Sequence, residues 1–147
     1  YDMAPEMKAD ELTAAVLKKM RGGAYQFIAL NYANADMVSH TGNLDAAVKA
    51  LETIDACLGR LWEAVQALDG TLIVTADHGN VEEMIDVTTG AIETEHSTNP
   101  APFVIASKAL KGFKELPRGV LADVAPTILG LLGIDQPAAM TGASLLA

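Results

Sequence analysis

The chain has 147 residues, half of them apolar and one fifth charged, and its formal net charge at neutral pH is −9. This length suits one folded domain, and the composition excludes a disordered tail. The acidic balance argues against a nucleic-acid partner, because a phosphate backbone would be repelled. The longest apolar runs are far shorter than the roughly 20 residues that span a bilayer, so we expect no membrane segment.

The first residues and the single cysteine bear on whether the chain is a fragment and on its location in the cell. It opens on Tyr1 rather than methionine and shows no basic or apolar leader, so we expect a fragment of a longer protein. Cys57 has no second cysteine to pair with and lies in a helical pattern, which favours a small buried side chain. We therefore expect a cytoplasmic location.

The first half of the chain alternates helical and strand patterns. Apolar residues recur at helical spacing from Ala9 to Met20, and a glycine pair follows. The mostly apolar run from Tyr25 to Tyr32 predicts a strand buried on both faces, so that Asp36 would lie just past its carboxyl end. From Leu44 to Leu68 the apolar residues advance in steps of three and four, which predicts a long amphipathic helix.

The second half continues this alternation. We expect a strand from Thr71 to Ala76, a hairpin turn from Val87 to Ala91 and a strand from Pro100 to Ser107. A polar loop from Lys108 to Arg118 would then lead into a helix from Ala122 to Leu132. These steps favour a doubly wound α/β sheet without an internal domain boundary.

Each of the three histidines lies beside an oxygen ligand, in the patterns Asp36-x-x-x-His40, Asp77-His78 and Glu95-His96. Imidazole and carboxylate groups together hold borderline divalent ions such as manganese, zinc, cobalt or iron. The first two patterns follow predicted strands, where the ligands of open α/β sheets bind. The sequence therefore predicts metal chemistry at this edge.

The spacing suggests how the ligands divide between two ions. Residues four apart share one face of a helix, so Asp36 and His40 can bind one ion, with His96 arriving from a separate loop. Asp77 and His78 can serve a second, neighbouring ion. Two such ions about 3.5–4 Å apart support hydrolysis or phosphoryl transfer.

Simpler interpretations stand beside this one. A lone Asp-x-x-x-His pair is more often a surface ion pair or a cap. The hydroxyl groups near these patterns are interpreted as turn, cap or outer-shell groups rather than nucleophiles; they are Ser39, Thr41, Thr75 and Ser97. The nearby glutamates are interpreted as solvated loop carboxylates, although Glu95 is a possible ligand; they are Glu82, Glu83, Glu93 and Glu95.

Three segments resemble successive motifs of cofactor-independent phosphoglycerate mutases. They are Asn34-Ala-Asp-Met-Val-Ser-His-Thr-Gly-Asn43, Thr75-Ala-Asp-His-Gly-Asn80 and Glu95-His-Ser-Thr-Asn-Pro100. The resemblance extends from Tyr1-Asp-Met-Ala-Pro-Glu-Met7 through Leu121–Leu129 to Met140-Thr-Gly142, so it covers essentially the whole chain in order. Ser39 and Ser97 depart from the usual glycine and threonine, and neither is a proposed ligand.

The resemblance implies an alkaline phosphatase-like fold, a three-layer αβα sandwich with a mostly parallel sheet, here as a partial domain. Residues 1–147 would be the C-terminal portion of the metal-binding phosphatase domain, without its N-terminal segment and without the inserted transferase domain. By position, Asp36, His40 and His96 match the ligands of one Mn²⁺, and Asp77 with His78 match ligands of the second.

In that family a serine carries the phosphoryl group between the hydroxyls of 3-phosphoglycerate and 2-phosphoglycerate. The resemblance places this serine in the absent N-terminal segment, so we expect no catalytic nucleophile in this chain and no activity from it alone. The chain alone would bind one ion or none, with Zn²⁺ as an alternative to Mn²⁺. The parent enzyme would be a monomer, whereas the fragment would self-associate through an exposed sheet edge.

Two alternatives remain open. Phosphopentomutases and plain phosphomonoesterases share the Asp-His-Gly pattern and a downstream histidine, although the segment from Asn34 to Asn43 argues against both. A non-catalytic module that binds a metal for stability would use the same residues.

Overall fold

The computed structural model describes residues 1–110 and 115–146. Positions 111–114, which belong to the polar loop expected from Lys108 to Arg118, and position 147 lie outside the described residues. The chain divides into two compact units, Tyr1–Ala109 and Leu110–Ala147, and each is described by itself. No described helix is both long and apolar enough to cross a bilayer.

Helix α1, Ala9–Arg21, forms where the helical pattern predicts it. Its first turn is acidic and its last turn basic, an arrangement that complements the helix dipole. Gly22 caps the helix, and Gly23 follows at a φ of +64°, a backbone conformation that favours glycine. The predicted start and stop of this helix are therefore confirmed.

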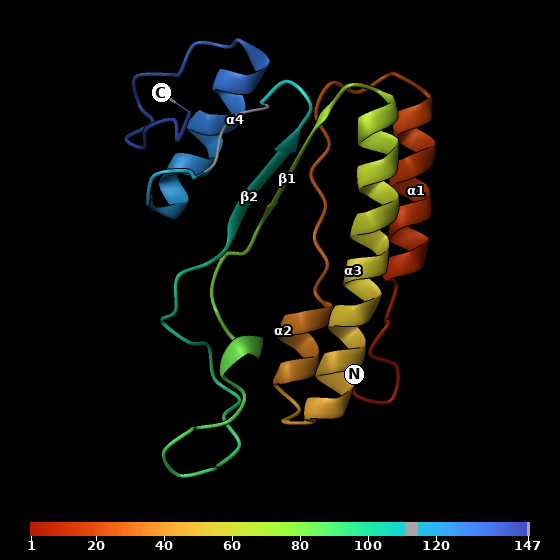
Figure 1. Ribbon diagram of the computed structural model, residues 1–147, viewed down its shortest axis with the longest axis vertical. Helices are drawn as coiled ribbons and strands as arrows, with labels where there is room; N and C mark the ends of the chain where they lie inside the picture. The colour runs from red at the N-terminus through yellow and green to blue at the C-terminus, as the bar shows by residue number, and fades with distance from the viewer. Residues whose placement is uncertain (111–114, 147) are drawn as a thin grey trace. The chain divides into compact units, whose positions relative to one another are not determined.

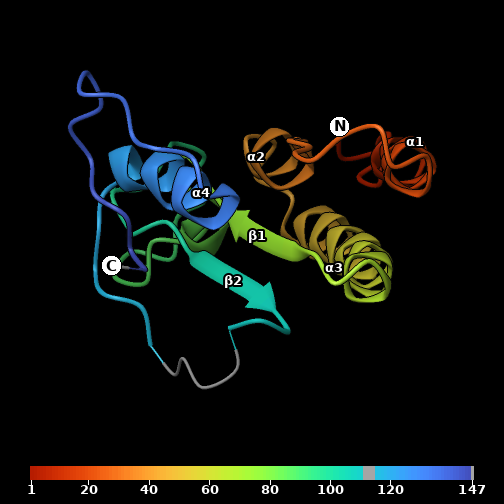
Figure 2. The ribbon, with the colours of Figure 1, turned by 90° about the horizontal axis from the view of Figure 1, so that it is seen from above.

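Helix α3, Leu44–Ala67, is the long helix predicted from the steps of three and four. The Asn43 side chain accepts a hydrogen bond from the backbone N–H of Ala46, which caps its first turn. Its apolar stripe packs on α1, where Leu61 is 2% exposed between Val16 and Leu17. Figure 1 and Figure 2 show the two helices side by side.

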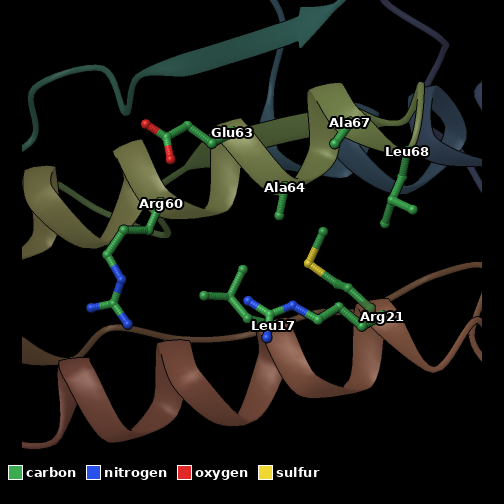
Figure 3. Close-up of a pocket in the computed structure, with 8 residues that line it drawn as sticks. Leu17, Arg21, Arg60, Glu63, Ala64, Ala67 and Leu68 are labelled. Carbon is green, nitrogen blue, oxygen red and sulfur yellow. The ribbon is translucent and has the colours of Figure 1, made fainter.

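An open groove lies between α1 and α3 (Figure 3). It is lined by Leu17, Met20, Arg21, Arg60, Glu63, Ala64, Ala67 and Leu68. Arg60 donates to the carboxylate of Asp10 at 2.5 Å and so links the two helices at the surface. Apolar side chains therefore hold the helices together, and charged groups border the contact.

The short helix α2, Asn34–Ser39, is fixed at both ends. The buried Asn34 side chain donates to the carbonyl groups of Pro5 and Glu6 at 2.8 and 2.9 Å. Val38 is fully buried in a second core cluster, which α3 and Met84 complete. These contacts set the position of Asp36, in the first turn of the helix.

Strands β1, Thr71–Thr75, and β2, Phe103–Ser107, form a two-stranded sheet. They pair antiparallel, with Ile73 opposite Ile105. The predicted positions of both strands are confirmed, but the mostly parallel sheet is not found in the described residues. The connection from β1 to β2 contains the 3₁₀ turn η1, Val81–Glu83, and short bridged turns but no crossover helix, so the chain returns as an antiparallel neighbour.

The segment from Tyr25 to Tyr32 is not a strand in the structure, contrary to the prediction. It is drawn as an extended trace that runs in the same direction as β1 (Figure 1). Ile28, Leu30 and Tyr32 pack on the core between α1 and α3, while Tyr25 and Phe27 are 56% and 53% exposed. The segment lacks a ladder of backbone hydrogen bonds within the described residues, so it does not form a strand despite its strand propensity.

The predicted hairpin turn is confirmed. The backbone N–H of Asp86 donates to the carbonyl of Ala91 at 2.9 Å, and Ile85 forms an isolated bridge with Ile92. Gly90 turns the chain at a φ of +71°. This hairpin projects from the region between β1 and β2 and leads toward His96.

The second unit is built around Asp123. A 3₁₀ turn, η2 (Leu121–Asp123), precedes α4 (Val124–Leu132), which Gly133 ends at a φ of +66°. The Asp123 carboxylate accepts backbone hydrogen bonds from Val120 and Ala143, both at 2.8 Å, which hold its pKa below the usual range. The helix predicted from Ala122 to Leu132 is confirmed. Through its hydrogen bond with Ala143, the Asp123 carboxylate connects the start of α4 to the segment that follows the helix.

Candidate metal centre

Helix α2 and the loop after the hairpin bring three predicted ligands together. Asp36 lies in the first turn of α2 and His40 caps its end, so both face the same side. One carboxylate oxygen of Asp36 lies 3.1 Å from Nε2 of His40 and 3.1 Å from Nε2 of His96. The two imidazole Nε2 atoms are 3.2 Å apart. Potential ligand atoms of the Asp36–His40–His96 cluster thus lie within 4.8 Å of one another.

The tautomer of His40 suits a metal ligand. Its Nδ1 lies 2.6 Å from the backbone carbonyl of Thr94, and a carbonyl can only accept a hydrogen bond. Nδ1 must therefore carry a proton, so the nitrogen that a metal would use is Nε2, which faces Asp36 and His96. At metal sites, the ring nitrogen that does not bind the ion commonly donates a hydrogen bond, and this bond fixes the orientation of the imidazole.

Asn80 supports this cluster through hydrogen bonds. It is 5% exposed, and its amide nitrogen donates to the Asp36 carboxylate at 2.9 Å. Its amide oxygen accepts a hydrogen bond from the buried Ser39 hydroxyl at 2.7 Å. This chain of contacts joins the loop after β1 to α2, and it agrees with the interpretation of Ser39 as a hydrogen-bonding group rather than a nucleophile.

The charge state of Asp36 also fits a ligand. Burial raises the pKa of its carboxyl group, but the hydrogen bond from Asn80 and the nearby imidazoles of His40, His78 and His96 outweigh burial. The net result is a pKa below the usual range of an aspartate. Asp36 is therefore an anion at neutral pH, as a divalent cation requires.

The two predicted ligands of the second ion, His78 and Asp77, lie in different surroundings. The His78 ring stacks on that of His96, with centroids 3.8 Å apart, so it lies beside the cluster. The Asp77 side chain is 80% exposed, and its carboxylate is 3.6 Å from Nε2 of His78. Among the described residues Asp77 does not join the group of three converging ligands. Glu95, the alternative ligand, is also outside that group.

Two supporting residues escaped the sequence analysis. Asn80 follows Asp77-His78-Gly79 directly, yet amide side chains in turns are common and carry no signal of their own. Glu82 was interpreted as a solvated loop carboxylate. It is exposed, as expected, but it also accepts hydrogen bonds from Ser97, from Asn99 and from the backbone of Asn80, which that interpretation did not foresee.

Comparison with known families bears on this cluster. A family model described as the metalloenzyme superfamily matches residues 1–136, which is most of the chain and includes every predicted ligand. The chain belongs to the metalloenzyme superfamily. Membership is consistent with a divalent metal at the Asp36–His40–His96 cluster, whose donor set independently fits such an ion.

Two curated relatives of this superfamily member share a name. A 2,3-bisphosphoglycerate-independent phosphoglycerate mutase of Syntrophotalea carbinolica is 52% identical over 99% of this chain, and one of Clostridioides difficile is 48% identical over 99%. The matches confirm the family resemblance drawn from the three motifs. The chain spans 28% and 29% of the length of these two relatives.

The fold is confirmed by a solved structure. Leishmania mexicana phosphoglycerate mutase, determined at low cobalt concentration, superposes with a TM-score of 0.86 at 32% identity. The match covers 97% of this chain and 29% of that protein. This superfamily member therefore has the alkaline phosphatase-like α/β fold as a partial domain, although its two described strands pair antiparallel.

Proposed function

We propose that this chain is the C-terminal portion of the metal-binding phosphatase domain of a cofactor-independent phosphoglycerate mutase. The complete enzyme would interconvert 3-phosphoglycerate and 2-phosphoglycerate through a phosphoserine intermediate. The names of the relatives favour this activity over phosphopentomutase or phosphomonoesterase activity. The observation that carries the proposal is the convergence of Asp36, His40 and His96 on one point.

These three residues would hold the first ion, which we propose to be manganese. His78 would contribute to a second ion beside it, together with Asp77 after rotation of its exposed side chain. Bound divalent ions would neutralise charge on a phosphoryl group and lower the pKa of an attacking hydroxyl. Zinc is the main competitor, because imidazole and carboxylate ligands accept it readily.

The residues of this chain would act by preorganising the ligands. Asn80 orients the Asp36 carboxylate, and the carbonyl of Thr94 holds the His40 ring with its lone pair toward the site. The phosphoryl-accepting serine and the groups that bind glycerate would come from other parts of the enzyme. We therefore propose that the isolated chain binds metal but does not turn over substrate.

Titration calorimetry of the purified chain with Mn²⁺ tests this proposal. We expect about one ion per chain, and loss of binding in the His40→Ala/His96→Ala double variant. An Asp77→Asn variant is the matched control, because Asp77 lies outside the converging group and its change should leave the first ion bound. Absence of binding in a folded wild-type chain, or binding that survives in the double variant, would contradict the proposed site.

A further inference from the structure

The carboxylate of Glu82 joins two loops that carry different histidines. Glu82 lies on η1, after the loop of His78, and accepts a hydrogen bond from the Ser97 hydroxyl. The same oxygen accepts from the Asn99 side-chain amide at 3.1 Å. Its second oxygen accepts from the backbone N–H of Asn80 at 2.8 Å. One carboxylate therefore contacts groups on the loop of His78 and on the loop of His96.

The two loops meet closely at this carboxylate. The backbone N–H of Ser97 donates to the carbonyl of Gly79 at 2.9 Å, which forms an isolated bridge. Gly79 is buried, and a Cβ atom at this position would collide with the Ser97 hydroxyl and the Glu82 carboxylate. Glycine at position 79 thus leaves room for the carboxylate and the hydroxyl to meet, and a larger residue would displace them.

Ser97 directly follows His96, so a contact that holds Ser97 restricts where the backbone of His96 can lie. His96 itself is exposed, and so is most of the hairpin that precedes it, with Val87 98% exposed. The ring stacks on that of His78 and its Nε2 lies 3.1 Å from the Asp36 carboxylate, but the exposed hairpin itself gives it little support. Polar contacts at the junction, together with the Thr94 carbonyl on His40, also hold the loop near α2.

We propose that Glu82 is a positioning residue that holds His96 in the metal centre by anchoring Ser97 to the loop of His78. The proposal rests on the proposed metal-binding function and adds a residue that touches no predicted ligand. Glu83, its neighbour on η1, provides a natural comparison. It carries the same charge, but its contact is a single hydrogen bond from Asn99 at 3.2 Å.

The test compares Glu82→Gln with Glu83→Gln in the full 147-residue chain. Loss of an outer-shell partner commonly lowers metal affinity about 10- to 100-fold. Because Glu82 touches no ligand itself, we expect a loss at the lower end of that range, about 10-fold, in the Mn²⁺ affinity of Glu82→Gln, and an affinity near that of the wild type in Glu83→Gln. Circular dichroism of both variants checks that the fold is retained.

A second readout needs no metal. In NMR spectra of histidine-labelled, metal-free chain, Glu82→Gln should shift the ring resonances of His96 and of His78, which stacks on it, whereas Glu83→Gln should leave them in place. Ser97→Ala should reproduce the shift, and the double variant with Glu82→Gln should add little to it.

The outcomes separate this inference from the metal proposal. If the wild-type chain binds no ion, the proposed metal site fails, and the metal-free spectra alone decide whether Glu82 positions His96. Unchanged His96 resonances in a folded Glu82→Gln variant would overturn the inference. Equal affinity losses in the Glu82 and Glu83 variants would also overturn it, because they would indicate a general effect of charge.

Discussion

Asn80 donates a hydrogen bond of 2.9 Å to the carboxylate of Asp36, which lies 44 residues earlier in the chain. The contact places a neutral, buried amide beside a candidate metal ligand and orients the carboxylate without competing for the ion. The same amide contacts Ser39, so the loop after β1 is joined to α2 at one point. The geometry of the metal centre thus depends on a residue that is not itself a predicted ligand.

Replacing Asn80 should weaken metal binding. We expect Asn80→Ala to lower the Mn²⁺ affinity of the chain about 10- to 100-fold, because an outer-shell partner of a ligand is lost. Titration calorimetry measures the change, with Asn31→Ala as the control at an exposed asparagine. An unchanged affinity in a folded Asn80→Ala variant would show that the orientation of the Asp36 carboxylate does not depend on Asn80.

The stability of the chain should depend on the charge of Glu82. The hydrogen bond from Ser97 is the largest cause that lowers the pKa of Glu82 from 4.5 to about 2. A depressed pKa in the folded state stabilises the protein above pH 4.5, and this stabilisation is lost as the pH falls toward 2. Solvent screening makes the effect smaller than the shift alone implies, because the side chain is exposed.

Urea unfolding at several pH values measures this dependence. The difference in unfolding free energy between the wild type and Glu82→Gln should be largest near pH 7 and should shrink between pH 4.5 and 2. Glu83→Gln serves as the control for a change of charge on the same turn. A Glu82→Gln difference that stays constant across this range would rule out the charged carboxylate as its source.

The packing of α1 on α3 should dominate the stability of the first unit. Leu61 is 2% exposed in this core, so Leu61→Ala should lower the unfolding free energy by roughly 2–5 kcal/mol. Leu68→Ala removes the same atoms from a side chain that is 57% exposed and should cost far less. Equal losses, measured by urea unfolding, would show that burial does not govern the effect.

The isolated chain should not catalyse the mutase reaction. With added Mn²⁺ we expect no conversion of 3-phosphoglycerate into 2-phosphoglycerate, because the proposed mechanism needs a serine from outside this chain. A coupled enzymatic assay measures conversion, and a complete phosphoglycerate mutase in the same assay is the positive control. Turnover that copurifies with the chain would contradict its proposed incompleteness.

The extended segment from Tyr25 to Tyr32 should promote self-association. Its backbone lacks a strand partner within the described residues, and Phe27 is 53% exposed on its open face. Sedimentation velocity should show association that grows with concentration and is reduced by Phe27→Lys. Val87→Lys, in a loop where the side chain is 98% exposed, is the control. A monomer at high concentration would disprove this expectation.

Local patterns were sufficient for most of the elements. The apolar periodicity of α1 and α3 repeats within a few residues, and the capping contact of Asn43 on α3 also spans only a few. Both helices could therefore be predicted from residues close together in the sequence. The strand from Tyr25 to Tyr32 could not, since strand formation requires hydrogen bonds from a partner that local sequence does not specify. The antiparallel pairing of β1 with β2 depends in the same way on the path of the connection.

For this protein, sequence alone determined the ligand types, the helices and the family motifs, because these follow from side-chain chemistry and short-range spacing. The motif spacing also predicted that Asp36, His40 and His96 come together, but only the tertiary structure showed that Asp77 stays apart from them. The tertiary structure also decided the supporting roles of Asn80 and Glu82. Such contacts span tens of residues, and only the path of the folded backbone sets which polar groups come within hydrogen-bonding distance.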